Sequence, residues 1–312
     1  MKILFAIGVF LFILINIMAF FHAYRFTHFS KSATATSVLP NGFWSKIKLI
    51  VFGVANPKPV AQQMPSNPYQ SLIIAGKTPT HAWFFKTENA KGTVLIAHGY
   101  ASQKSNMLDR SEAFLSMGYN TLLIDFMGCG QSKSYQSTLG FHEAQQVANA
   151  FAYLHNIGEK NIILYGKSMG AVAITKAMKD KQLPAQGLIL ESAFGQMYAT
   201  VCARFKSMGL PSFPMAGLLT FWGSVQNTFW AFGHNPIQYA KQINCPSLIM
   251  VGLEDDKVSF DETQQIYQNL LNPYKKLIAF AHAGHENLLQ HSPAIWQSAV
   301  AGFLAELPVL ND

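Results

Sequence analysis

Gly166-Lys167-Ser168-Met169-Gly170 is the stretch that decides the fold, because it places a serine between two glycines where a strand gives way to a helix. Residues 162–165 before it form a short apolar segment, as expected of a buried parallel strand. The apolar residues within 171–178 are typical of a helix. Such a sharp turn leaves room only for hydrogen at both glycines. The stretch predicts a nucleophile elbow that lifts the Ser168 hydroxyl above a sheet.

A phosphate-binding loop is the competing interpretation, because Gly166-Lys167-Ser168 also matches the end of that motif. The motif requires a glycine five residues before Gly166, and Asn161 stands there. A strand, not a flexible glycine-rich loop, joins the two positions. The sequence therefore disfavours a nucleotide hydrolase.

Strand and helix patterns alternate along the rest of the chain. The predicted strands are 72–75, 82–85, 93–97, 120–124, 162–165, 188–190, 247–251 and 277–280, and the predicted helices are 107–117, 141–155, 169–180, 263–271 and 294–304. This alternation predicts an α/β fold with a mostly parallel sheet covered by helices on both faces. The active site of such a sheet lies at the carboxyl ends of its strands. We expect one catalytic domain over residues 69–312.

An insert at about 193–235 interrupts this alternation between two strands, and we expect it to form a helical cap. It is rich in aromatic residues: Phe194, Tyr198, Phe205, Phe213, Phe221, Trp222, Phe229, Trp230 and Phe232. Two interpretations stay open. The aromatic side chains line an apolar path for an acyl chain, or they form the core of the cap itself.

The amino terminus carries an apolar run at residues 3–21, with Asn16 as its only polar member. Nineteen residues are enough for a helix to cross the core of a bilayer. A signal peptide is the alternative, but the small-x-small site at Ala33-Thr34-Ala35 lies too far downstream. We expect a retained single-pass anchor at residues 1–24. Lys2 and the α-amino group on one side of the run roughly match Arg25 and Lys31 on the other, so the flanking charges do not assign the side of the membrane.

Positive charge is concentrated near this predicted anchor. Residues 1–87 contain eight Lys and Arg and no Asp or Glu, so their net charge is +8. The rest of the chain contains 15 Lys and Arg and 16 Asp and Glu, a net charge of −1, which gives +7 for the whole chain. The segment 25–68 is expected to be a basic juxtamembrane linker that either meets anionic headgroups or simply stays solvated. Because the catalytic part is near neutral, no nucleic-acid partner is expected.

Acyl-transfer chemistry at Ser168 requires a histidine to take its proton and a carboxylate to orient that histidine. The order along the chain in this kind of fold is Ser, then acid, then His. The strand at 247–251 is followed by Glu254-Asp255-Asp256. We choose Asp255, because it lies three residues after Gly252 and three before Val258, and we expect its acidic neighbours to be solvated.

The predicted base is His285, which follows Gly284 after the strand at 277–280 and has the backbone freedom to reach inward. His282 and His291 are the weaker choices. The oxyanion hole is predicted from the backbone amides of Met169, which follows the nucleophile, and Tyr100, in the loop after the strand at 93–97.

Other sites are not indicated by the sequence. His142-Glu143 and His285-Glu286 lack the second histidine of a zinc motif, and no glycine-rich dinucleotide motif opens a helix. We therefore expect neither a metal nor a cofactor. Cys129, Cys202 and Cys245 are expected to be buried packing residues.

Together, the loops 98–100, 125–132, 166–170, 252–258 and 284–285 resemble the α/β-hydrolase superfamily over about residues 72–304. With its amino-terminal anchor, the chain is most similar to membrane-anchored α/β-hydrolase-domain proteins and their bacterial relatives. The resemblance implies a cofactor-free serine hydrolase with the triad Ser168, Asp255 and His285. The expected substrate is a small carboxylic ester or thioester with an apolar acyl group. A serine peptidase and an inactive membrane-bound binding protein of the same fold are the alternatives.

Overall fold

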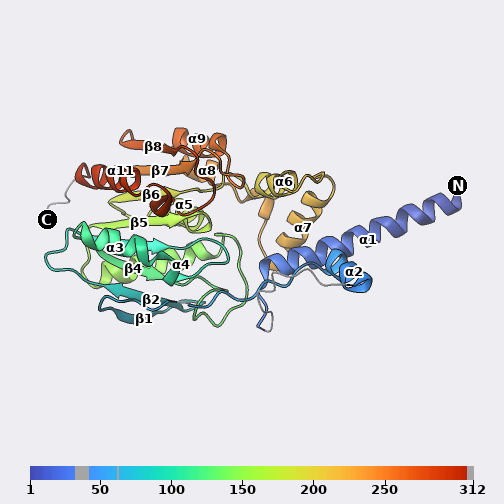
Figure 1. Ribbon diagram of the computed structural model, residues 1–312, viewed down its shortest axis with the longest axis horizontal. Helices are drawn as coiled ribbons and strands as arrows, with labels where there is room; N and C mark the ends of the chain where they lie inside the picture. Colours follow the sequence, from blue (N-terminus) through green and yellow to red (C-terminus); the bar gives the residue numbers. More distant parts are fainter. Residues whose placement is uncertain (32–41, 62, 308–312) are drawn as a thin grey trace. The chain divides into compact units, whose positions relative to one another are not determined.

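The computed structural model describes residues 1–31, 42–61 and 63–307. Eight strands form one sheet in the order β1-β2-β4-β3-β5-β6-β7-β8 (Figure 1). Strand β2 pairs antiparallel with β1 and with β4, and all other neighbours are parallel. The strands are β1 Gln70–Ile74, β2 Thr80–Phe85, β3 Thr93–Ala97, β4 Asn120–Ile124, β5 Ile162–Lys167, β6 Gly187–Glu191, β7 Ser247–Gly252 and β8 Lys275–Phe280. The predicted α/β class is confirmed.

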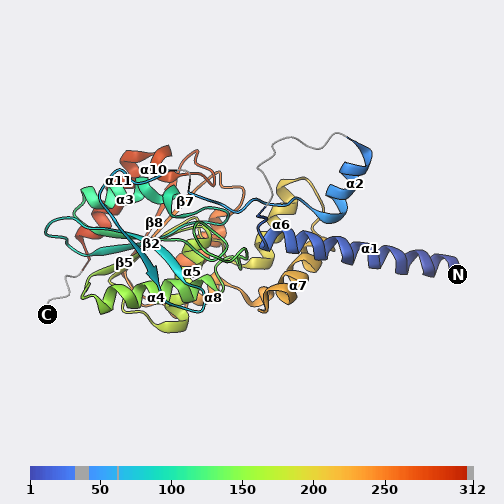
Figure 2. The same ribbon diagram turned by 90° about the horizontal axis from the view of Figure 1, so that it is seen from below.

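Helices cover both faces of the sheet, as predicted (Figure 2). Side chains of α3 and α11 pack on one face, and α4 and α5 pack against each other on the opposite face. The helices of this part are η1 Lys104–Met107, α3 Leu108–Ser116, α4 Glu143–Asn156, α5 Met169–Lys181, α8 Pro236–Ala240, α9 Phe260–Asn269, α10 Leu288–His291 and α11 Pro293–Ala305.

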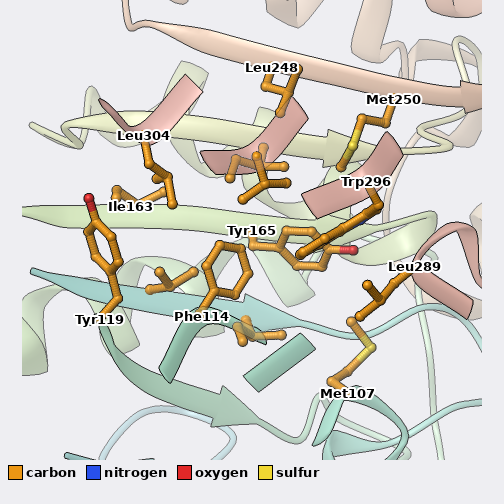
Figure 3. Packing of buried hydrophobic residues seen from close by; sticks show 14 of the residues in the cluster. Met107, Phe114, Tyr119, Ile163, Tyr165, Leu248, Met250, Leu289, Trp296 and Leu304 are labelled. Atoms are coloured by element: carbon orange, nitrogen blue, oxygen red, sulfur yellow. The ribbon is translucent and has the colours of Figure 1, made fainter. Parts of the chain in front are cut away.

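Strand β5 shows how the core is built. Its alternate residues Ile163 and Tyr165 join a buried cluster with α3 and α11 (Figure 3). The Tyr165 ring lies 5.6 Å from that of Phe114 and 6.2 Å from that of Trp296, centroid to centroid. Because both faces of β5 are covered, its sequence reads as a continuous apolar run. The packing fixes β5 and therefore the turn that follows it.

The chain divides into two compact units, which we call the sheet unit (residues 59–196 and 235–312) and the helical unit (residues 1–58 and 197–234). The helical unit contains α1 Lys2–Thr27, α2 Phe43–Phe52, α6 Met197–Ser207, α7 Met215–Asn227 and η2 Ala231–Gly233. Within the described residues, α1 is the one helix long and apolar enough to cross a membrane.

Two segments differ from a plain sequence interpretation. The segment 25–68, expected as a linker, includes the helix α2, and the insert expected at 193–235 shares a compact unit with the amino-terminal segment. The site Ala33-Thr34-Ala35 and part of the expected linker, residues 32–41 and 62, lie outside the described residues.

Candidate active site

The turn at Ser168 has the strained geometry of a nucleophile elbow. Strand β5 ends at Lys167, α5 begins at Met169, and Ser168 between them has φ 51° and ψ −116°. A Cβ on Gly166 would lie 2.5 Å from the Ala171 nitrogen, and a Cβ on Gly170 would lie 2.3 Å from the Ala97 oxygen. Neither backbone atom can move aside, so the close packing of helix on sheet requires both glycines.

The structure brings Ser168, His285 and Asp255 into one hydrogen-bonded chain. Ser168 Oγ lies 3.0 Å from His285 Nε2, and His285 Nδ1 lies 2.8 Å from Asp255 Oδ2. An ionised carboxylate only accepts hydrogen bonds, so the imidazole carries its proton on Nδ1 and leaves Nε2 to accept from the hydroxyl. The arrangement can move one proton from Ser168 to His285.

Asp255 is held as the acid of this chain by its loop. Its side chain is fully buried, and its Oδ1 accepts hydrogen bonds of 2.9 Å from the amides of Lys257 and Val258. Burial raises the pKa of Asp255, but the hydrogen bond and charge of His285, with those two amides, outweigh burial and lower it below its usual value. Asp255 therefore stays ionised at neutral pH.

The competing histidines pair with other side chains, and Asp256 is exposed. His282 is 87% exposed at its side chain and pairs with Glu254 at 2.9 Å, Nδ1 to Oε1. His291 Nε2 lies 3.6 Å from Glu286 Oε1. Of the acids and histidines considered from the sequence, His285 contacts the nucleophile and Asp255 contacts His285.

The predicted oxyanion donors lie on two segments that approach each other. Met169 is the first residue of α5, where a backbone amide has no partner within its own helix. Tyr100 lies in the turn after β3. A Cβ on Gly99, beside Tyr100, would be 3.6 Å from the Ser168 Cβ. The turn after β3 therefore approaches the elbow closely, and the oxyanion hole formed by the two amides stays a prediction.

His98 fixes this turn as a structural residue. Its buried ring bonds the Gly99 oxygen through Nδ1 at 2.8 Å and accepts from the Phe126 amide through Nε2 at 3.1 Å. Burial lowers the pKa of His98, mainly because a charged imidazole would be desolvated, so the ring stays neutral and serves both bonds.

The glycine-containing loop at 125–132 acts as a scaffold. Asp125 is buried and forms an ion pair with Lys104, and its Oδ2 accepts a hydrogen bond of 3.1 Å from the Gln131 amide. Gly130 has φ 51°, and a Cβ there would lie 2.0 Å from Asp125 Oδ2. The glycine lets the loop fold tightly over the buried carboxylate.

Comparison with known proteins supports a hydrolase of this fold. The family model described as serine aminopeptidase, S33, matches residues 88–227. The uncharacterized protein YqkD of Bacillus subtilis is 26% identical over 191 residues, or 60% of this chain and 63% of that protein. The lysophosphatidylserine lipase ABHD12 of Danio rerio is 24% identical over 200 residues, or 59% of this chain and 49% of that protein. The matches therefore span less than two thirds of either relative.

Comparison with a solved structure identifies the fold of this chain. The esterase Pf2001 of Pyrococcus furiosus superimposes with a TM-score of 0.68 at 24% identity, over 80% of this chain and 97% of that chain. The chain has the α/β-hydrolase fold, and the family match and the relatives support its membership of that superfamily. The resemblance and the enzyme class expected from the sequence are thus confirmed, and below we call the protein the hydrolase.

Behind the elbow of the hydrolase lies a buried charged cluster that was not predicted from the sequence. Glu191, at the end of β6, is fully buried; its carboxylate accepts from Arg110 Nη2 at 2.9 Å, from Trp296 Nε1 at 3.4 Å and from the Tyr165 hydroxyl. Its backbone oxygen accepts from the Ser168 amide at 2.7 Å. The sequence signal for this cluster is Glu191 itself, an acid directly after the apolar residues 188–190, because a carboxylate next to a buried strand needs buried partners.

Two links extend from this cluster to the loop that carries His285. Asp109 accepts from Arg110 Nη1 at 3.0 Å and from Asn287 Nδ2 at 2.6 Å. Lys167 of the elbow donates from Nζ to the Glu286 oxygen at 2.8 Å and lies 3.9 Å from Glu191 Oε1. Burial lowers the pKa of Lys167, with Glu191 opposing that shift. The nucleophile and base loops of the hydrolase are therefore joined by direct contacts.

Replacing Lys167 by methionine is expected to lower kcat about 10- to 100-fold, with a smaller change in KM. The tether from Nζ to Glu286 is lost, and a shift of about 1 Å in a catalytic group costs on that order. Lys179→Met is the matched control, because Lys179 lies at the far end of α5 and pairs with Asp180. Equal kinetics for both variants would show that Lys167 does not position His285.

Proposed function

We propose that the hydrolase cleaves carboxylic esters or thioesters through an ester formed on Ser168. The observation that carries this proposal is the chain from Ser168 Oγ through the His285 imidazole to Asp255, with contacts of 3.0 and 2.8 Å. His285 takes the hydroxyl proton as Ser168 attacks the carbonyl, then gives that proton to the leaving group. Water, activated in turn by His285, releases the acid. Asp255 orients the ring throughout.

The developing oxyanion is proposed to bind the amides of Met169 and Tyr100. Donors aimed at the position of the negative charge stabilise the transition state more than the substrate. The close approach of Gly99 to the Ser168 side chain supports this assignment.

An apolar acyl group and a membrane location complete the proposal. We propose that α1 is a retained single-pass anchor and that the substrate reaches the site from or near the bilayer. The length and apolar composition of α1 support this, as does the printed name of the ABHD12 relative, a lysophosphatidylserine lipase. The S33 description of the matched family favours a second candidate, peptide cleavage by the same residues.

A substrate panel with the full chain tests these functions. We expect p-nitrophenyl octanoate to be hydrolysed with a kcat/KM at least about tenfold above that of the acetate, because each buried methylene adds binding energy. Acyl thioesters are expected to follow the same order. Faster turnover of short, charged acyl esters would contradict the apolar preference. Cleavage of aminoacyl amides above all esters would favour the peptidase, and no turnover of any member would favour an inactive binding protein.

A further inference from the structure

The helical unit contains no acidic residue. Its residues, 1–58 and 197–234, carry eight Lys and Arg, so the 23 basic residues of the chain leave 15 for the sheet unit, which also holds all 16 acids. Between Lys206 and Lys241 the chain has no charged residue at all. Helix α7, which lies in this uncharged segment, therefore has no charged face; such a helix is unusual beside water, whereas the cations elsewhere in the unit suit contact with an anionic bilayer.

Helix α7 packs directly on the carboxyl-terminal half of α1 (Figures 1 and 2). Trp222 Nε1 donates to Asn16 Oδ1 at 3.3 Å, and Gln226 Nε2 donates to the Phe20 oxygen at 2.8 Å. The Phe20 and Trp222 rings meet edge to face at 5.3 Å. Asn16 is the single polar residue of the apolar run, and its side chain accepts the hydrogen bond of an indole N–H on the neighbouring helix. Polar side chains form such hydrogen bonds between helices in membranes.

The contacts place α7 at the depth of α1. Both hydrogen bonds join residues 206 apart in the sequence, so the two helices run in the same direction. A helix rises about 1.5 Å per residue, which puts Asn16 about 21 Å and Phe20 about 27 Å beyond Lys2. The hydrocarbon core is about 30 Å thick. If α1 spans this core from Lys2, the residues of α7 that touch it lie inside the same leaflet.

The outer face of α7 is suited to that environment. Phe221 and Val225, one helical turn apart, are 42% and 52% exposed, and Phe213 before the helix is 84% exposed. Helix α2 adds basic residues to the same unit: its Phe52 ring lies 4.8 Å from that of Phe21, while Lys46 and Lys48 are exposed. The unit therefore combines an apolar helix face with cations that anionic headgroups would attract.

We propose that α7 is a second membrane-inserted element, which lies beside α1 with its Phe221 and Val225 face against the acyl chains of one leaflet. The basic residues of the helical unit then face anionic headgroups. This inference rests on the proposed anchoring by α1 and goes beyond it: a single-pass anchor joined to a water-soluble domain needs no second helix in the bilayer. It also explains the specific contacts on Asn16, which a cleaved leader would not need.

Spin-label depth measurements on the full chain test the proposal. The native residues Cys129, Cys202 and Cys245 are replaced by alanine, and single cysteines are introduced as Val225→Cys, Phe221→Cys, Ile7→Cys and Ile157→Cys. The labelled proteins are reconstituted into vesicles of equimolar phosphatidylcholine and phosphatidylglycerol. Collisions of each nitroxide with oxygen, which concentrates in lipid, are compared with collisions with a water-soluble nickel chelate.

Labels at 225 and 221 are expected about 5–10 Å below the boundary between headgroups and acyl chains. The label at 7 reports the anchor, and the label at 157, an exposed aliphatic position at the end of α4, is expected in water. Lipid contact at 7 with water contact at both 225 and 221 would overturn the insertion of α7 and leave the anchor standing. Water contact at 7 would overturn the anchor and the inference together. Lipid contact at 157 as well would show that the signal is not specific to α7, and would also overturn the proposal.

Discussion

Ser168→Ala is expected to lower kcat for ester hydrolysis by about 10⁶-fold and to abolish labelling by a fluorophosphonate. The methyl group cannot attack the carbonyl, so the proposed acyl-enzyme never forms. Nucleophile and base act as a unit, which is why removal of either alone removes most of the rate. A residual rate about 10³- to 10⁴-fold above the reaction in water is expected, because binding and oxyanion stabilisation would remain. Initial rates and labelling followed by mass spectrometry give both readouts.

Asp256→Ala is the matched control for this result. Asp256 lies next to Asp255 in the chain but is exposed, so its loss changes the loop charge without touching the hydrogen-bonded chain. We expect turnover and labelling close to those of the unchanged hydrolase. Labelling of Ser168→Ala at another serine, or unchanged turnover in that variant, would assign the chemistry to a different residue.

The fold and the candidate triad could be predicted because their causes are local in the sequence. The glycines at 166 and 170 are required by backbone atoms within a few ångströms, and a buried parallel strand must be apolar throughout, so both leave a clear pattern. The turn position of Asp255 follows in the same way, since its Oδ1 caps amides two and three residues later. Such short-range requirements are readable in one sequence.

Long-range polar contacts left no comparable pattern. The ion pair of Arg110 with Glu191 joins residues 81 apart, and the hydrogen bonds between α1 and α7 join residues 206 apart. No spacing rule connects such positions, so the sequence shows only an arginine in a helix and an acid after a strand. The helix α2 was not predicted for a different reason. It is only ten residues long, it has no acid in its first turn, and no side chain caps its amino end, so its sequence gives a weak helix signal.

Arg110→Met is expected to destabilise the sheet unit strongly. Arg110 and Glu191 side chains are 2% and 0% exposed, and the pair is 2.9 Å apart. The substitution removes this close cation and leaves the buried carboxylate with only the more distant Lys167, at 3.9 Å. Breaking a buried pair from one side costs about 3–5 kcal/mol. For a unit of this size, that loss lowers the melting temperature by about 6–20 °C. Differential scanning calorimetry on the full chain in detergent measures the shift.

A double variant separates the lost charge partner from lost packing. In Arg110→Met with Glu191→Gln, the buried charge is gone and the amide can still accept from Tyr165 and Trp296, so most of the melting temperature should return. Lys276→Met removes a comparable ion pair with Glu306, but both side chains are substantially exposed, and solvent screening makes a shift close to zero the expected result. If the double variant melted as low as Arg110→Met, the cost would come from the cavity left by the arginine side chain. In that case the cluster behind Ser168 would stabilise the elbow through packing and not through charge pairing.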